Sequence, residues 1–388
     1  MIKDRTAKVK AAMVARGVDA ILVCDNTSLL YLSGAIFGGV AYISLEMSEP
    51  LLCVRRPVGM EGANVAYIRK VEDLPNVLRE RGLKQPERLA LEGDVATYNE
   101  YLRLAKIFSL PSEQIVPVAT AIMHTARSCK GEDEIEQLKA SAALHSQLYS
   151  LVPQIFKRGM SDQDLAIEIN HEALKLGAVG KMRIFGRTMD SALGSILVGE
   201  NASTPSPFDF ALGGGGVSGS MPYGANGTEI TDGTTIMVDH GGNFSHYITD
   251  MTRVFSLGKL PDIAYRAHSA ALEMQQRMVE MARVGSAVAE IYNMSIEVAQ
   301  REGLSEWFMG SAQQASFVGH GVGLEINEQP VLSPRSKSLF EVGNTIAFEP
   351  KFTLPKVGAV GIENTFVMRE NGLEQLTIFE ESIIPLEG

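Results

Sequence analysis

Four acidic residues stand at the ends of short apolar segments in the C-terminal two thirds of the sequence. Asp239 ends an apolar run, and Asp250 follows eleven residues later, beyond a Gly-Gly-Asn turn. Glu349 and Glu363 each follow an apolar run in the same way. Burying a carboxylate at such a place is costly unless the group is paired, hydrogen-bonded or bound to a metal. Any one of these acids alone would be read as a solvated strand end.

A histidine completes the set, because His320 lies in the glycine-rich stretch 319–323, where backbone and ligand can approach closely. The four carboxylates lack a matching cluster of Lys or Arg in the sequence pattern and would repel one another. A pair of divalent cations would resolve that conflict. Carboxylates with one imidazole suit Mn, Fe, Co or Zn rather than a metal that prefers thiolates. The pattern therefore predicts a site for two divalent metal ions.

The elements that position these residues form a repeat. Glycines bound two predicted helices of equal length, 159–177 and 285–303, and a pair of strands carrying two of the acids follows each helix. A hairpin over 235–252 would bring Asp239 and Asp250 onto neighbouring strands. The matching order favours an internal duplication of helix and antiparallel strands.

The N-terminal part of the sequence has a different pattern of apolar and polar residues. The spacing predicts a helix over 6–16 and a buried strand over 20–24, and short apolar runs alternate with helical segments after them, at 40–44, 50–54 and 88–91. Alternating strands and helices predict an α/β layer.

The charged, glycine-containing segment 130–134 is the predicted N-terminus of a long helix, and the sequence pattern changes there. We therefore expect an accessory domain over 1–126 and a second domain over 127–388. The predicted fold class is α+β, with an N-terminal α/β domain and a C-terminal domain of two similar halves.

Composition narrows the class of protein. The formal charge is −11, with 45% hydrophobic and 21% charged residues, which is too apolar for a disordered chain and unsuited to nucleic acid. No apolar stretch is long enough for a membrane span, and the N-terminus lacks a signal core. The three cysteines form no CxxC pair. We expect a cytoplasmic protein without nucleic-acid or membrane partners.

The motifs resemble those of the pita-bread metallopeptidase family, which includes aminopeptidase P, prolidase, methionine aminopeptidase and creatinase. The matching segments are Val238-Asp239, Asp250-x-Thr252-Arg253, Gly319-His320-Gly321-Val322-Gly323-Leu324, Glu349-Pro350 and Glu363-Asn364-Thr365. Their order and spacing match over 130–388. The first 125 residues are similar to the non-catalytic domain of the aminopeptidase P, prolidase and creatinase branch.

The resemblance implies roles for the five residues. All five would be metal ligands, namely Asp239, Asp250, His320, Glu349 and Glu363. Asp239 and Glu363 would bridge two metals, and Glu349 would also serve as the general base or proton shuttle. Two such ions activate water and stabilise an oxyanion. The resemblance further implies a homodimer. Creatinase works without metal and lacks the full ligand set, so the complete set here indicates a metal-dependent member.

Three positions depart from the family pattern. Tyr223 stands where the peptidases carry a histidine, sixteen residues before Asp239. Asn327 replaces a second histidine, seven residues after His320, and Gly361 replaces an arginine two residues before the last glutamate. Tyrosine and asparagine donate hydrogen bonds, but neither relays protons near pH 7 as histidine does. We expect Tyr223 and Asn327 to line the substrate pocket.

His240 and His246 are the candidates for replacing a lost histidine. His246 precedes Asp250 by four residues, so a regular strand would place both on one face, whereas His240 directly follows Asp239 and should face the other way. A surface or packing role is the alternative.

Three hypotheses follow. The first is a dinuclear metal-dependent hydrolase resembling Xaa-Pro aminopeptidases and dipeptidases, in which activated water attacks a C–N bond of a short peptide. The second is a related metalloenzyme acting on a non-peptide small molecule, as creatinase and the dimethylsulfoniopropionate lyases do. The third is a non-catalytic binding protein, which the complete ligand set disfavours.

Overall fold

A computed structural model describes residues 2–186 and 193–387. The chain divides into two compact units, Met1–Arg127 and Ser128–Gly388. None of the described helices combines the length and the apolar character that crossing a membrane requires.

The first unit is an α/β layer, as the sequence predicts. Its helices are α1 (Ile2–Ala15), α2 (Asn26–Ser33), α3 (Leu74–Glu80), α4 (Tyr98–Ala105) and α5 (Ala119–Ser128), with short 3-10 turns at Val71–Asp73 and Ser112–Gln114. Its strands are β1 (Ala20–Val23), β2 (Gly39–Ser44), β3 (Leu51–Val54), β4 (Val65–Tyr67), β5 (Leu89–Leu91) and β6 (Ile115–Val116). They form one sheet in the order β4-β3-β2-β1-β5-β6.

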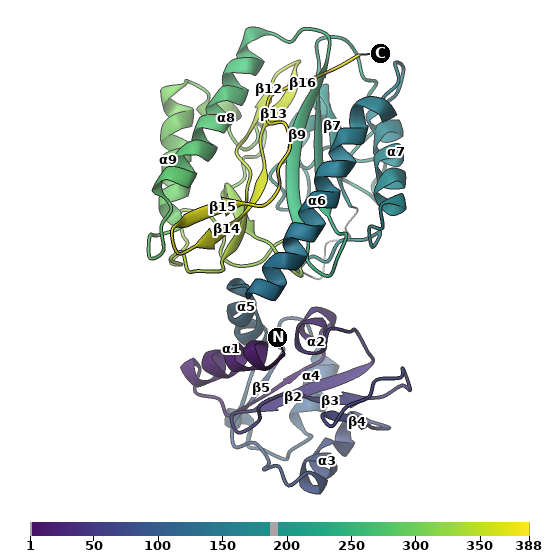
Figure 1. Cartoon of the computed structure of the whole chain (residues 1–388), viewed down its shortest axis with the longest axis vertical. Coiled ribbons are helices and arrows are strands. Elements are labelled where there is room, and N and C mark those ends of the chain that lie inside the picture. Colours follow the sequence, from purple (N-terminus) through teal and green to yellow (C-terminus); the bar gives the residue numbers. More distant parts are fainter. Residues whose placement is uncertain (1, 187–192, 388) are drawn as a thin grey trace. The chain divides into compact units, whose positions relative to one another are not determined.

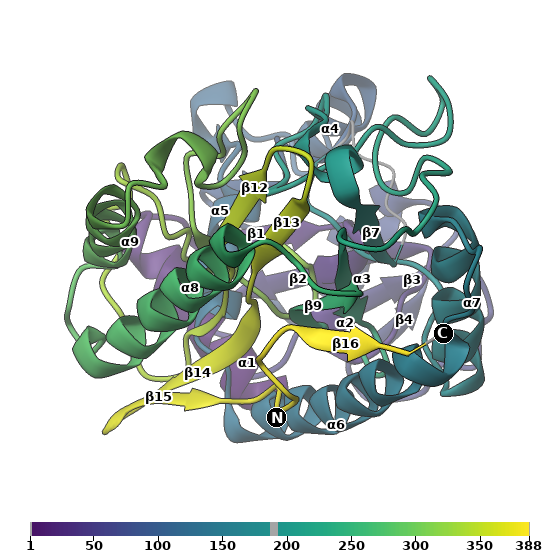
Figure 2. The same ribbon diagram turned by 90° about the horizontal axis from the view of Figure 1, so that it is seen from above.

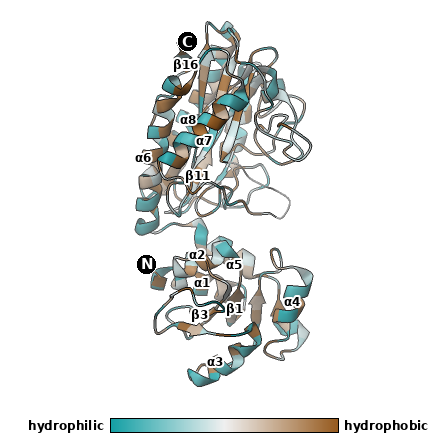
Figure 3. Cartoon of the chain, turned by 90° about the vertical axis from the view of Figure 1, so that its right-hand side faces the viewer, coloured by the Kyte–Doolittle hydropathy of each residue, from teal (hydrophilic) through white to brown (hydrophobic). Residues whose placement is uncertain are grey.

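The short apolar runs of this unit became the central strands. Every residue of β1, β3 and β5 is buried, which matches strands covered on both faces. Figure 3 shows hydrophobic colours on β1 and β3 and largely hydrophilic colours on helices α3 and α4. No residue of the five-residue set lies in this unit.

The second unit repeats one arrangement of helices and strands. Its helices are α6 (Glu132–Ile155), α7 (Asp162–Lys175), α8 (Asp262–Met281) and α9 (Ala289–Arg301), with 3-10 turns at Gly199–Ser203 and Ser305–Trp307. Its strands are β7 (Gly194–Val198), β8 (Thr235–Gly242), β9 (Thr249–Leu257), β10 (Gly319–Gly321), β11 (Thr345–Phe348), β12 (Lys351–Leu354), β13 (Gly358–Gly361), β14 (Asn364–Arg369), β15 (Gly372–Gln375) and β16 (Ile384–Leu386).

Two four-stranded sheets carry the repeat, in the orders β16-β9-β8-β7 and β10-β11-β14-β15. Each sheet follows a pair of helices in the sequence, so the predicted duplication is confirmed. The hairpin β12-β13 lies between β11 and β14 and has no counterpart between β8 and β9. Figures 1 and 2 show α6 and α7 on one side of the strands and α8 and α9 on the other.

His145 lies in α6, fully buried against the β8-β9 hairpin. Its Nδ1 lies 3.1 Å from the Thr249 hydroxyl, and its ring packs edge-on to Tyr149 at 5.2 Å between centroids. Burial, and to a smaller extent neighbouring His240 and Arg253, hold the pKa of this imidazole well below its usual 6.5. The folded protein therefore contains His145 in its neutral form.

We expect His145 to make the protein less stable as the pH falls. A histidine whose pKa is lower folded than unfolded contributes fully above the unfolded pKa, near 6.5, and loses stability below it, by about 1.4 kcal/mol per pH unit. His145→Gln should therefore flatten the dependence of unfolding free energy on pH between 7.5 and 5 in urea titrations. His171→Gln, at an exposed histidine, is the control. Parallel curves for His145→Gln and the wild type would contradict this expectation.

Candidate metal centre and substrate cavity

The first two acids lie side by side on the β8-β9 hairpin. In its register Asp239 pairs with Thr252 and Asp250 pairs with Gly241, so the two acids are offset by one two-residue step. Since residues two apart in a strand point to the same face, both carboxylates lie on one side of the sheet. The Gly-Gly-Asn turn between the two acids predicts this hairpin.

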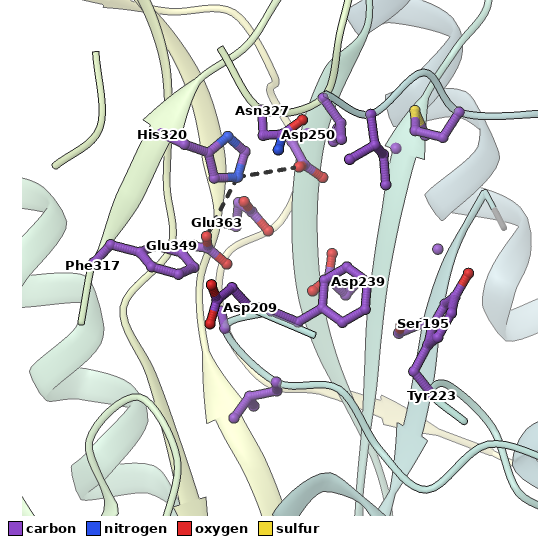
Figure 4. Close-up of a pocket in the computed structure, with 18 of the residues that line it drawn as sticks. Ser195, Asp209, Tyr223, Asp239, Asp250, Phe317, His320, Asn327, Glu349 and Glu363 are labelled. Atoms are coloured by element: carbon purple, nitrogen blue, oxygen red, sulfur yellow. Dashed lines mark ion pairs between the residues drawn. The ribbon is translucent and has the colours of Figure 1, made fainter. Parts of the chain in front are cut away.

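The other three residues come from the second sheet. His320 lies in β10 and pairs with Ala347 of β11, and Glu349 follows the last residue of β11. Glu363 directly precedes β14 and forms an isolated bridge to Thr252 of β9. Glu363 therefore joins the two sheets, and all five predicted side chains come together where the sheets meet (Figure 4).

Two overlapping groups of three ligand atoms result. One group contains Asp250, His320 and Glu363, and the other contains Asp239, Glu349 and Glu363; within each, the ligand atoms lie within 4.8 Å of one another. His320 Nε2 is 3.5 Å from Glu349 Oε1 and 3.9 Å from Asp250 Oδ2, the two contacts dashed in Figure 4. The chemistry of these donors suits a hard or borderline divalent cation.

Lys351, the first residue of β12, lies among the carboxylates. Its Nζ donates to Glu349 Oε2 at 2.7 Å, to Asp239 Oδ2 at 2.8 Å and to Glu363 Oε2 at 3.2 Å. The lysine side chain is fully buried. The sequence pattern indicates no matching cluster of Lys or Arg, and the structure adds one ammonium to the acids, from strand β12, that the pattern does not reveal.

Burial and mutual repulsion change the protonation of this cluster. Burial, followed by the charges of Glu363, Asp239 and Glu349, raises the pKa of Asp250 well above its usual value. Burial also raises the pKa of Glu363 to about 8, although Lys351 opposes this shift. Burial disfavours the charge of Lys351, but its three carboxylate partners prevail and raise its pKa.

Neighbouring residues hold the acids in place. Thr252 Oγ1 donates to Glu363 Oε2 at 2.7 Å, and the Thr365 hydroxyl bonds both the backbone N and O of Asp250, at 2.8 and 2.9 Å. Buried Arg253 donates to the Glu363 carbonyl at 2.9 Å. Glu363 Oε1 is buried and has no hydrogen-bond partner among the described residues.

The two groups differ in how well they fit a divalent cation. In the group of Asp250, His320 and Glu363, the unpartnered Glu363 oxygen is an acceptor that a cation would satisfy, so one ion fits. In the other group the Lys351 ammonium bonds an oxygen of every member. A second divalent ion does not fit there unless the ammonium leaves.

The five residues form the floor of a cavity of about 390 Å³. Its walls are largely apolar and include Met182, Ile184, Phe185, Leu193, Phe210, Leu212, Phe317, Ile326 and Val331. This volume and lining suit a small molecule or a short peptide. Apart from His320 and Tyr223, the ionisable residues among its described lining are all carboxylic acids, and they include the exposed Asp209.

The structure brings two of the three predicted substrate residues to the cavity. Tyr223 lines it and packs against Phe208 and Phe210, with ring centroids 5.7 and 5.1 Å apart. Asn327 also lines it, and its Oδ1 accepts from the Phe185 backbone N–H at 3.0 Å. That bond leaves the Asn327 amide nitrogen as the donor available to a ligand.

His246 is not among the described residues that line the cavity. It is exposed in the turn before β9, and its carbonyl accepts from Arg183 Nη2 at 2.6 Å. The prediction assumed a regular strand from 246 to 250, whereas β9 begins at Thr249. The alternation of faces therefore does not extend to His246, and the predicted role is corrected to a turn residue.

Sequence reasoning missed Lys351, Asp209 and Phe317. For Lys351 a signal existed, because it lies two residues after Glu349 and directly beyond the Glu-Pro motif. For Asp209 and Phe317 we find no local signal, because both lie outside regular strands and helices.

Comparison with known proteins agrees with this architecture. The profile of metallopeptidase family M24 matches residues 136–370, and that of the creatinase/prolidase N-terminal domain matches residues 5–129. An Xaa-Pro dipeptidase of Pyrococcus furiosus is 23% identical over 99% of this chain and 100% of its own. An uncharacterized peptidase of Bacillus subtilis is 25% identical over 95% and 96%, respectively.

Solved structures with the same fold include two proline-peptide enzymes. An Xaa-Pro dipeptidase from Bacillus anthracis superposes with a TM-score of 0.80 at 22% identity, covering 100% of both chains. An X-Pro aminopeptidase from Thermotoga maritima gives 0.76 at 23% identity, covering 97% of this chain and 99% of the other. At this identity the superpositions establish the fold.

Proposed function

The chain belongs to metallopeptidase family M24, and from this premise we propose that it is a metal-dependent hydrolase that cleaves a C–N bond of a small substrate. The observation that supports the proposal is the meeting of Asp239, Asp250, His320, Glu349 and Glu363 on the floor of one cavity. The family resemblance implies two ions of Mn, Co, Zn or Fe, whereas the residues described above fit one, held by Asp250, His320 and Glu363.

Within this proposal, Asp250, His320 and Glu363 hold a divalent cation. Such an ion supplies a Lewis acid that polarises a carbonyl and lowers the pKa of water. Glu349 accepts the proton of the attacking water and passes it to the leaving nitrogen. Its Oε2 is held by Lys351, and its Oε1 faces His320, so the carboxylate has a fixed orientation.

Tyr223 and Asn327 orient the substrate in the places where the peptidases carry histidines. The phenol and the amide donate hydrogen bonds to a substrate oxygen. Neither exchanges a proton near pH 7, so proton transfer falls to Glu349. This loss of two titrating groups favours the alternative in which the substrate is a non-peptide small molecule, as for a creatinase-like amidinohydrolase or a lyase.

The charge of the cavity indicates the class of substrate. Its described lining holds no Lys or Arg to pair with a substrate carboxylate, whereas the exposed Asp209 suits an amine. We propose a short peptide or amide that carries an amino group and no carboxylate close to the scissile bond. Among peptides, we propose one whose second residue is proline.

The experiment is a substrate panel assayed with Mn, Co or Zn and with the bound metal measured. It contains Xaa-Pro dipeptides, the same dipeptides as C-terminal amides, tripeptides and non-peptide amides and amidines. We expect kcat/KM to be at least about tenfold higher for a dipeptide amide than for the free acid, because like charges brought together cost several kcal/mol. Turnover of no member by metal-loaded protein would reject the hydrolase, and equal rates for acid and amide would reject the charge preference.

The proposal also includes a homodimer located in the cytoplasm, which follows from the family resemblance and from the sequence. Light scattering of the purified protein tests the dimer, and fractionation of cells tests the location.

A further inference from the structure

Lys351 is a fully buried lysine among the carboxylates of the candidate metal centre. Resting on the metal site of the proposed function, we propose that the Lys351 ammonium takes the place of one of the two divalent cations, so that this protein binds a single divalent ion per chain. The ion lies with Asp250, His320 and Glu363, and the ammonium lies with Asp239, Glu349 and Glu363.

The hydrogen bonds of Lys351 are those of a bound cation. An ammonium has three N–H donors. Each finds a carboxylate oxygen of a different residue, at 2.7, 2.8 and 3.2 Å. These are the same three residues that make up the second group of candidate metal ligands. The ammonium therefore occupies the charge position that a divalent ion would need, and all of its donors are used.

Strand β13, which pairs with β12, has a glycine opposite this lysine. Lys351 pairs with Gly361 across the β12-β13 hairpin. A Cβ at position 361 would lie 2.8 Å from Lys351 Cα and 3.1 Å from its Cγ, and the φ of Gly361 is +151°. A side chain at 361 would therefore displace the lysine stem. The arginine that the family resemblance places at this position is absent, and the cation comes from the opposite strand instead.

The group of Asp250, His320 and Glu363 still has an acceptor that a cation would satisfy. Lys351 bonds only Oε2 of Glu363, while the buried Oε1 has no partner among the described residues. Among the described residues, neither Asp250 nor His320 forms a hydrogen bond or ion pair with Lys351. Nε2 of the imidazole is directed towards the carboxylates (Figure 4). When all four carboxyls are ionised, as metal binding requires, their charge exceeds that of the single ammonium, and one divalent ion largely offsets the excess.

Metal counting tests the proposal independently of turnover. The full-length protein, purified without chelator and dialysed against excess Mn²⁺ or Zn²⁺, is analysed by mass spectrometry of its metals. We expect one ion per chain in the wild type and two in Lys351→Ala, which vacates the second group. Lys130→Ala removes another buried lysine, paired with Glu328 at 2.8 Å, and should leave the count at one.

Electron paramagnetic resonance of the Mn²⁺-loaded wild type gives a second readout that needs no variant. A lone ion is expected to give the spectrum of isolated Mn²⁺, and a magnetically coupled pair would overturn the proposal. Two ions or none in the wild type, or no gain in folded Lys351→Ala, would also overturn it. Failure of every substrate in the panel would reject the proposed hydrolase without changing the metal count, so the two failures are distinguishable.

Discussion

Replacing Lys351 with methionine is expected to lower the free energy of unfolding of the metal-free protein by about 3–5 kcal/mol, the cost of removing one partner from a buried ion pair. Methionine keeps the unbranched stem and nearly the same volume as lysine. The decrease in the free energy of unfolding therefore measures the removal of the charge rather than the creation of a cavity. The acids left behind cannot all reach water, because Glu349 and Glu363 are buried. Their repulsion is then no longer offset.

Urea unfolding in buffer with EDTA measures this loss. Lys259→Met, at an exposed lysine in the same domain, is the matched control and should stay within about 0.5 kcal/mol of the wild type. A loss below about 1 kcal/mol in Lys351→Met would mean that the ammonium does not compensate the carboxylates.

Acid pH provides an internal check on this prediction. The pKa of Glu363 is about 8 in the folded chain, above its ordinary 4.5, so this carboxyl becomes neutral in the folded state as the pH falls through 8. A neutral carboxyl needs no counter-cation. The raised pKa of Lys351 keeps the ammonium charged throughout this range. We therefore expect the difference between wild type and Lys351→Met to be smaller at pH 5.5 than at pH 8.5.

Much of the fold was predictable because local patterns and tertiary structure agree. The apolar run at 20–24 became the fully buried strand β1, and the glycine-bounded segment 285–303 contains α9. The turn between Asp239 and Asp250 formed the predicted hairpin. At each of these places the side-chain pattern, the turn residues and the burial favour the same structure.

The rest depended on information that is not local. The predicted position of His246 was wrong because β9 begins at Thr249, a few residues later than expected. Outside a strand, side chains no longer alternate between two faces, so His246 need not share a face with Asp250. Lys351 was missed because a lysine alone in a sequence indicates a solvated surface. The role of Lys351 depends on the meeting of the β12-β13 hairpin, the β8-β9 hairpin and the end of β11. The sequence near residue 351 does not indicate that Asp239 is its partner.

Glu349→Gln is expected to lower kcat by about 10²–10⁴-fold on the best substrate of the panel, because it removes the proposed proton acceptor. Glutamine keeps the shape of the side chain and an oxygen for the Lys351 ammonium, 2.7 Å away in the wild type. Substrate contacts in the cavity are retained, so KM should change by less than about threefold.

Steady-state and single-turnover kinetics at matched metal content separate this loss from loss of the ion. Glu341→Gln, at an exposed glutamate eight residues earlier, is the control and should retain wild-type rates. Unfolding curves of both variants establish that each is folded. A kcat within about threefold of the wild type in metal-loaded Glu349→Gln would assign the proton to another group. Asp239 is then a candidate, because it lines the same cavity and also bonds Lys351.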